Sequence, residues 1–165
     1  MRRYFNTWKF RHPEPIDFIR VMEKISSMQL KWYLSYWINT TKRIDYSIKS
    51  ILENGSETFV TLERIGDLPM PVDLHVTYKD GTSEIYYVPL NETLGNKQVE
   101  NRSVPRTDLD AWPWVNPSFT LKINKTSAEI ATVEIDPTMR MADIDRKNNK
   151  ADLANGLKGF ANQTK

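Results

Sequence analysis

The sequence predicts an α+β protein in which a short N-terminal helical segment precedes an antiparallel β-sandwich. The first observation is the period of the apolar residues, which changes from about 3.6 to 2 near Asp45. The second is a pair of dipeptides typical of tight hairpins, Asn54-Gly55 and Asp80-Gly81. The third is the set of six or seven short period-two stretches with turns between them, which indicates a sandwich of strands.

Residues 1–44 have the pattern of short amphipathic helices. Residues 1–10 resemble the middle of a helix, with Tyr4 and Trp8 as an i,i+4 pair, which suggests a piece of a longer protein. After a proline-containing break at residues 12–15, two apolar stripes follow at helical spacing. They are Phe18, Val21, Met22 and Ile25, and then Leu30, Tyr33, Leu34, Trp37 and Ile38, widened by Trp32 and Tyr36. Stripes this broad cannot bury each other fully, so we expect them to pack on the sheet or on a further part of a parent protein.

The strand-rich part is predicted to be an immunoglobulin-like sandwich. The predicted strands are residues 46–53, 56–65, 72–78, 83–90, 119–123 and 128–135. The 72–78 stretch alternates most clearly, and Asp80-Gly81 after it predicts a type I′ turn. Pro69 and Pro71 donate no ladder hydrogen bond and are expected at the start of a strand or on an exposed edge.

Composition divides the chain into three parts and excludes several function classes. We expect a helical segment over 1–44, the sandwich over 45–137, and a polar, weakly ordered tail over 138–165. A net charge of +2 is too small to argue for nucleic acid or an anionic membrane, and no apolar run approaches the ~20 residues of a membrane span. The absence of cysteine excludes disulfides and thiolate chemistry.

The residues that carry metal chemistry are sparse and do not form a known motif. The two histidines, His12 and His75, are expected to be surface or structural, because zinc sites need three or four converging ligands. Asp143-Ile144-Asp145 resembles the opening of a calcium loop, but Asn148 stands where glycine is required. We therefore assign no catalytic, cofactor-binding or metal-binding residue in this chain.

Trp112, Trp114 and Phe119 form an aromatic group in a proline-rich connector. They suit either a platform for a carbohydrate or peptide, or a plug at the end of the sandwich core. We favour the plug, since large aromatic side chains dominate protein cores.

Several stretches resemble one enzyme family. In the helical part they are Phe10-Arg11-His12-Pro13-x-Pro15-x-Asp17-Phe18, Met22-Glu23, Leu30-x-Trp32-Tyr33-Leu34-x-Tyr36-Trp37 and Asn39-Thr40-Thr41-Lys42-x-Ile44-Asp45-Tyr46. In the strand-rich part they are Val60-Thr61-Leu62-Glu63, Pro69-Met70-Pro71-Val72, Val76-x-Tyr78-x-Asp80-Gly81, Tyr86-Tyr87-Val88-Pro89-Leu90, Trp112-Pro113-Trp114 and Val133-Glu134-Ile135-Asp136-Pro137 with Met141-Ala142-Asp143. Residues 10–53 resemble the last helices of the catalytic domain in bacterial aminopeptidase N-like zinc metallopeptidases, the gluzincins. Residues 57–143 resemble the β-sandwich domain that follows it.

The resemblance implies what a parent protein would do. A zinc ion held by His-Glu-x-x-His and a downstream Glu would activate water to remove N-terminal residues from peptides. None of these motifs is present here, so the resemblance implies a structural C-terminal part that is inactive alone. Its partner would be the N-terminal catalytic part, and the parent would be exported to a bacterial periplasm or cell envelope.

The alternative is a stand-alone sandwich module that binds a protein or a glycan. In that case Trp112 and Trp114 should be exposed, whereas a brace for a catalytic domain should bury them. The breadth of the helical stripe favours the C-terminal part of an aminopeptidase over the stand-alone module, because a covered interface requires a wide apolar face.

Overall fold

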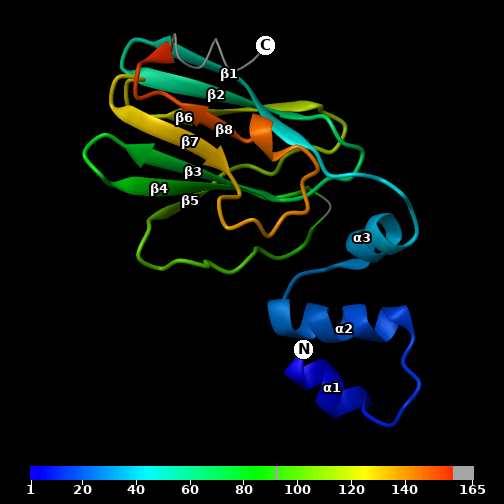
Figure 1. The fold of residues 1–165 in the computed structure, drawn as a ribbon. Coiled ribbons are helices and arrows are strands. Elements are labelled where there is room, and N and C mark those ends of the chain that lie inside the picture. Colours follow the sequence, from blue (N-terminus) through cyan, green and yellow to red (C-terminus); the bar gives the residue numbers. More distant parts are fainter. Residues whose placement is uncertain (92, 158–165) are drawn as a thin grey trace.

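The computed structural model describes residues 1–91 and 93–157 (Figure 1). Helices come first: α1 (Arg2–Trp8), α2 (Pro15–Ser26), α3 (Lys31–Tyr33) and the π-helical turn η1 (Leu34–Ile38). The strands are β1 (Tyr46–Asn54), β2 (Glu57–Arg64), β3 (Val72–Tyr78), β4 (Ser83–Val88), β5 (Arg106–Asp108), β6 (Ser118–Ile123), β7 (Ile130–Ile135) and β8 (Lys150–Asp152), with the 3₁₀ turn η2 (Arg146–Asn148) before β8. The predicted α+β class is confirmed.

The strands form two sheets of unequal width. One sheet has three strands in the order β1-β2-β6, and the other has five in the order β5-β4-β3-β7-β8. All pairs are antiparallel except β4–β5, which is parallel. We call the strands and their connections the two-sheet body. The inward-facing residues of both sheets meet in one hydrophobic core.

Strand β3 at the centre of the wider sheet shows why the period-two pattern is informative. Val72, Leu74 and Val76 are at most 1% exposed, whereas the alternate residues Asp73 and His75 are only half-buried. The alternation predicted from sequence is confirmed at this strand. The apolar face supplies the core, and the polar face carries charged groups outside the sheet.

Both predicted hairpins exist, but their turns differ from the predicted ones. Asn54 still pairs with Glu57, so the first loop is Gly55-Ser56, with a positive φ of 64° at Gly55 as in a turn with glycine first. The prediction of a type I′ turn at Asp80-Gly81 is wrong. Gly81 alone has a positive φ, 85°, and its N–H donates to the Tyr78 carbonyl, which makes a three-residue loop.

The second hairpin departs from type I′ for a local reason. Asp80 accepts hydrogen bonds at Oδ1 from the Thr82 N–H (2.8 Å) and the Thr82 hydroxyl (2.6 Å). This Asx arrangement suits a turn in which Asp80 keeps negative φ, so only glycine adopts the left-handed conformation.

The segment predicted to be a weakly ordered tail is instead built into the two-sheet body as far as it is described. Residues 150–152 form β8 against β7, and Ala151 and Leu153 are both 0% exposed. Asp136 fixes the preceding loop, because its carboxylate accepts from the Met141 N–H (2.7 Å) while Arg146 donates to its carbonyl oxygen (2.7 Å). Residues 158–165 of the predicted tail lie outside the described residues.

The helical segment lies beyond one end of the two-sheet body, opposite the β3–β4 hairpin (Figure 1). Helix α2 begins at Pro15 after a capping box between Glu14 and Asp17, as the proline break predicts. It buries Ile19 and Val21 rather than the whole predicted stripe, and Ile25 is 44% exposed. None of the helices in the described residues has the length and apolar content needed to cross a membrane.

The second predicted stripe is interrupted by a change of helical pitch. Residues 34–38 form a π-helical turn, which rotates the following side chains away from the face they would share in an α-helix. Trp32, which precedes this turn, is buried in the core. Trp37 and Ile38, which lie within the turn, are 41% and 48% exposed. The expectation that these faces cannot bury each other completely is confirmed.

Candidate functional site

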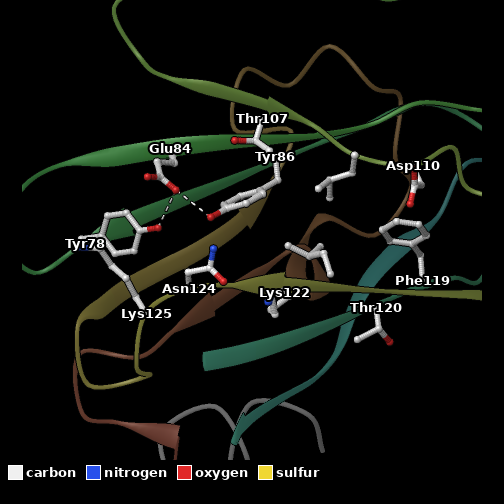
Figure 2. A pocket seen from close by; sticks show the side chains of 12 residues that line it. Tyr78, Glu84, Tyr86, Thr107, Asp110, Phe119, Thr120, Lys122, Asn124 and Lys125 are labelled. Atoms are coloured by element: carbon white, nitrogen blue, oxygen red, sulfur yellow. Dashed lines mark hydrogen bonds between the residues drawn. The ribbon is translucent and has the colours of Figure 1, made fainter. Parts of the chain in front are cut away.

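A cavity of about 610 Å³ opens where the two sheets differ in width (Figure 2). We call it the open-edge cavity. Its lining comes from β3, β4, β5, β6 and the connections that flank β5 and β6. The lining residues are Tyr78, Glu84, Tyr86, Thr107, Leu109, Asp110, Phe119, Thr120, Leu121, Lys122, Asn124 and Lys125. Its volume lies in the range of ligand pockets, which is ~300–1,000 Å³.

The strand order explains why the cavity exists. Strand β6 is the last strand of the three-stranded sheet, whereas β4 and β5 continue the five-stranded sheet past it. The cavity therefore opens between β6 on one sheet and the β4–β5 side of the other. Side chains of β6 such as Phe119 and Leu121 form one wall, and Tyr86 and Leu109 form the other.

The polar centre of the cavity is Glu84, which lies on the inward face of β4. It pairs with Val76 across the β3–β4 ladder, so its side chain points toward the core side of the sheet. Its Oε2 accepts hydrogen bonds from the hydroxyls of Tyr78 (3.0 Å) and Tyr86 (2.8 Å), and Figure 2 shows the two hydroxyls converging on it. One carboxylate oxygen is thus held by two neutral donors.

The two tyrosines remain donors at neutral pH. Burial raises the pKa of Tyr86 to about 12 and raises the pKa of Tyr78 as well, with the neighbouring Glu84 charge adding to both shifts. A phenol that keeps its proton can donate to a carboxylate but cannot neutralise it. Neither tyrosine contact therefore supplies Glu84 with a cationic partner.

The two lysines of the cavity are engaged elsewhere. Lys122 Nζ lies 3.0 Å from Glu57, and Lys125 Nζ lies 3.8 Å from Glu129 and 4.3 Å from the centre of the Tyr78 ring. Among the described residues, no Lys or Arg nitrogen lies within 4.0 Å of the Glu84 carboxylate. The cavity lining thus mixes apolar and polar side chains, and Glu84, partly buried at its centre, forms no ion pair with the two lysines that share the lining.

The aromatic connector divides into one core residue and one joint residue. Trp112 is 4% exposed, packs edge-on against Tyr46 and donates from Nε1 to the Asn116 carbonyl (2.9 Å). The plug interpretation is confirmed for Trp112.

Trp114 is half-buried and joins the helical segment to the two-sheet body. It stacks on Tyr36 with ring centres 5.8 Å apart, and Lys42 and Arg64 lie over its ring at 5.1 Å and 4.7 Å. Neither tryptophan is presented as a flat, solvent-facing platform.

The residues considered for metal binding do not come together. His12 is exposed in the α1–α2 connection, and His75 is half-buried on the outer face of the five-stranded sheet. Burial lowers the pKa of His75, an effect opposed by nearby carboxylates, of which Asp73 acts most strongly. In residues 1–91 and 93–157 no three His, Cys, Asp or Glu side chains form a group that could hold a metal, so the chain's own residues do not fit the zinc site.

Asp143 and Asp145 bind backbone groups rather than facing a common centre. Asp143 Oδ2 accepts from the Tyr46 N–H (2.9 Å), which ties the 138–149 segment to β1. Asp145 Oδ1 accepts from the Lys147 N–H (3.1 Å) and caps η2. The calcium-loop likeness therefore reflects turn geometry.

A cluster of charged side chains holds the long connection of residues 91–105 against the outer face of the wider sheet. Lys97 Nζ contacts the carboxylates of both Asp73 and Glu100, and Arg140 reaches Glu100 from the other side (3.0 Å). The Lys97 N–H also donates to the Tyr87 hydroxyl (3.3 Å).

The open-edge cavity was missed at the sequence level, although a weak signal exists. Glu84 lies two residues before Tyr86 and four before Val88, so it shares their inward-facing side of the strand. A carboxylate therefore occupies a core-side position. The neighbouring Ile85 and Tyr87 are also apolar and buried, which hides the alternation. Pairing with β3 resolves the ambiguity, because β3 alternates cleanly.

Comparison with protein-family models, with curated protein sequences and with solved structures gives no match to this chain.

Proposed function

We propose that this chain is an immunoglobulin-like β-sandwich, with an adjoining helical segment, of a bacterial zinc-dependent aminopeptidase of the aminopeptidase N-like type. The observation that carries the proposal is the uncovered apolar surface of the helical segment. Phe5, Phe10, Trp37 and Ile38 are 65%, 100%, 41% and 48% exposed. Large apolar side chains left exposed along a helical segment are typical of a surface that another part of a protein covers.

The residues that carry the family resemblance support the proposal through their positions. Tyr36 and Trp114 belong to separate resembling stretches, and they stack on each other where the helical segment meets the two-sheet body. Asp136 and Met141 belong to a third stretch, and they fix the loop that leads to β8. Such joints suit a protein in which a sandwich must hold a fixed position relative to helices.

In such a parent the chain has a bracing role. The zinc ion, its ligands and the general base come from the catalytic part, because His12 and His75 do not lie near other ligands. The helical segment continues the catalytic part, and the sandwich holds that segment through Trp114 and supports one side of the peptide-binding cleft. Zinc and the N-terminus of a peptide are then partners of the parent, and the parent acts in the periplasm or cell envelope.

The experiment is an activity assay on material captured from source cells with an antibody against this chain. We expect hydrolysis of an aminoacyl-arylamide that a zinc chelator abolishes and added zinc restores. The purified chain, assayed in parallel, should show neither hydrolysis nor stoichiometric zinc. Chelator-sensitive activity in the purified chain, or its absence from the captured material, would contradict the proposal.

A stand-alone binding module is the second candidate, and the open-edge cavity favours it. A cavity of about 610 Å³ with a charged group at its centre suits ligand recognition rather than bracing. The antibody capture separates the two candidates, because a stand-alone module would be recovered at the mass of the chain and without peptidase activity.

A further inference from the structure

The free edge of β6 distinguishes this two-sheet body from one whose sheets cover each other fully. Strand β6 pairs with β2 on one side, and no other described strand pairs with its second side. Alternate residues of a strand direct their N–H and C=O groups to opposite edges. Every second residue of Ser118–Ile123 therefore offers a donor and an acceptor to the open-edge cavity side.

The other sheet edges offer less room. The 143–148 segment covers the start of β1, through a bridge between Ile44 and Asp143 and a hydrogen bond from Asn148 to Asp45 (3.1 Å), and the cavity does not reach this strand. Strands β5 and β8 are only three residues long. Strand β6, with six residues, is the edge at which a further strand would find both backbone partners and a cavity beside it.

We propose that the open-edge cavity binds an extended peptide segment, which adds to β6 as a strand and places a lysine or arginine side chain against Glu84. This inference stands apart from the proposed function, since it requires neither zinc nor a catalytic part. A strand added to β6 would widen the three-stranded sheet on the side where the cavity opens toward β5. Strand addition of this kind draws affinity from main-chain hydrogen bonds and specificity from side-chain pockets.

The geometry of a strand matches the cavity. An added strand would lie ~4.8 Å from β6, with alternate side chains directed between the sheets. Those side chains would meet Phe119 and Leu121 on one wall and Leu109 on the other. The apolar part of the lining therefore favours apolar residues two positions before and after the basic one.

The charge of Glu84 selects the basic residue. Its Oε2 is held by the Tyr78 and Tyr86 hydroxyls, and neither of these neutral donors cancels its charge. A partly buried carboxylate without a cationic partner costs free energy, which an ammonium or guanidinium group from a ligand would offset. The exposed Asp110, at the end of the cavity near Phe119, adds a second negative charge.

The tyrosines also contribute to this selectivity. Their rings at Tyr78 and Tyr86 stand on either side of the Glu84 carboxylate, as Figure 2 shows. A cation that approaches Glu84 would pass close to these rings, and aromatic rings attract cations. Lys125 already lies over the Tyr78 ring at 4.3 Å, so a ligand's cation would have to displace Lys125 from that ring.

The test uses the full chain and a labelled, end-capped peptide in which valine and threonine alternate around one central lysine. Fluorescence anisotropy measures its affinity, and backbone amide NMR signals locate it. We expect saturable binding that weakens with added salt, with shifts and slowed amide exchange confined to residues 118–123 and the cavity lining. Glu84→Gln should weaken binding by about tenfold or more, because it keeps the acceptor oxygen but removes the charge.

Matched controls separate the backbone and charge contributions. Glu134→Gln removes a carboxylate from the outer face of the same sheet, where it pairs with Lys150, and should leave binding unchanged. A peptide with norleucine in place of lysine should bind about tenfold more weakly, and one N-methylated at alternate amides should not bind.

Any one of several results would overturn the proposal. The first is equal binding of the lysine and norleucine peptides, and the second is full binding of the N-methylated peptide. The third is no saturable binding of the lysine peptide, or shifts confined to the helical segment. Binding of a neutral oligosaccharide in the cavity, with exchange at β6 unchanged, would assign the cavity to a glycan and likewise overturn strand addition.

Discussion

Replacing Trp114 with alanine should destabilise the chain, because this side chain joins the helical segment to the two-sheet body. The indole ring stacks on Tyr36 at 5.8 Å and lies under Arg64 at 4.7 Å and Lys42 at 5.1 Å. The half-buried ring removes roughly 100 Å² of apolar surface from water, which corresponds to ~2.5 kcal/mol at 25 cal/mol per Å². The stack and the two cation–π contacts contribute ~0.5–1 kcal/mol each, partly counted already in that area. The expected loss is therefore about 3 kcal/mol.

Trp37→Ala is the matched control, because it removes the same side chain from a more exposed position. Trp37 is 41% exposed and stacks only on Tyr33, at 5.8 Å. Its loss should cost about 1 kcal/mol. Urea unfolding followed by far-UV circular dichroism measures both, with an unchanged m-value showing that the two-state comparison holds. A loss below 1 kcal/mol at Trp114, or equal losses at both positions, would refute the view that Trp114 is the joint.

Four further predictions concern stability. Leu153→Ala should cost about 2–5 kcal/mol in urea unfolding, since Leu153 is 0% exposed, and a loss under 1 kcal/mol would show that the 150–153 segment is not part of the core. Gly66→Ala should lower the free energy of unfolding by more than about 2 kcal/mol or prevent folding. The reason is that the added Cβ would contact the Arg43 carbonyl oxygen and lie 2.6 Å from the Asp45 nitrogen. A thermal melt like that of the unaltered chain would contradict this close packing. Lys97→Met should lower the melting temperature and expose the 91–105 connection to proteolysis, as it removes the cation between Asp73 and Glu100; an unchanged cleavage rate would argue against this contact. In the His75→Gln variant the free energy of unfolding should decrease less on acidification than in the unaltered chain. Urea titrations at several pH values would measure this, and His12→Gln, at an exposed position, is the control.

The sign of the His75 prediction follows from the direction of its pKa shift. Burial lowers the folded-state pKa, so the unfolded chain binds the proton more readily. The stability contribution is then fully present above the unfolded pKa of about 6.5 and is lost as pH falls through the folded pKa. A steeper loss in the His75→Gln variant than in the unaltered chain would contradict this sign.

Local chemistry made much of the fold readable from the sequence. The alternation of Val72, Leu74 and Val76 predicts β3 with its correct bounds, because one face is buried and the other is polar. Turn positions were less accurate, since Asn54-Gly55 and Asp80-Gly81 suit several loop lengths, and strand pairing decides among them.

The elements that were missed depend on tertiary contacts. Strand β8 has one core-facing residue, Ala151, between Lys150 and Asp152, which is too short a stretch to show a period. The π-helical turn at residues 34–38 moves Trp37 away from the face that an α-helical repeat predicts. The open-edge cavity arises from the unequal widths of two sheets, and sheet width depends on strand order rather than on any one stretch of sequence.

The mass of the native protein in its source cells tests the central claim most directly. An antibody raised against this chain would detect it on a denaturing gel of total cell extract. A band several times heavier than the 19.3 kDa of this chain is the result that a brace within a zinc aminopeptidase predicts. A band at 19.3 kDa, with none heavier, would contradict that account and leave the stand-alone module.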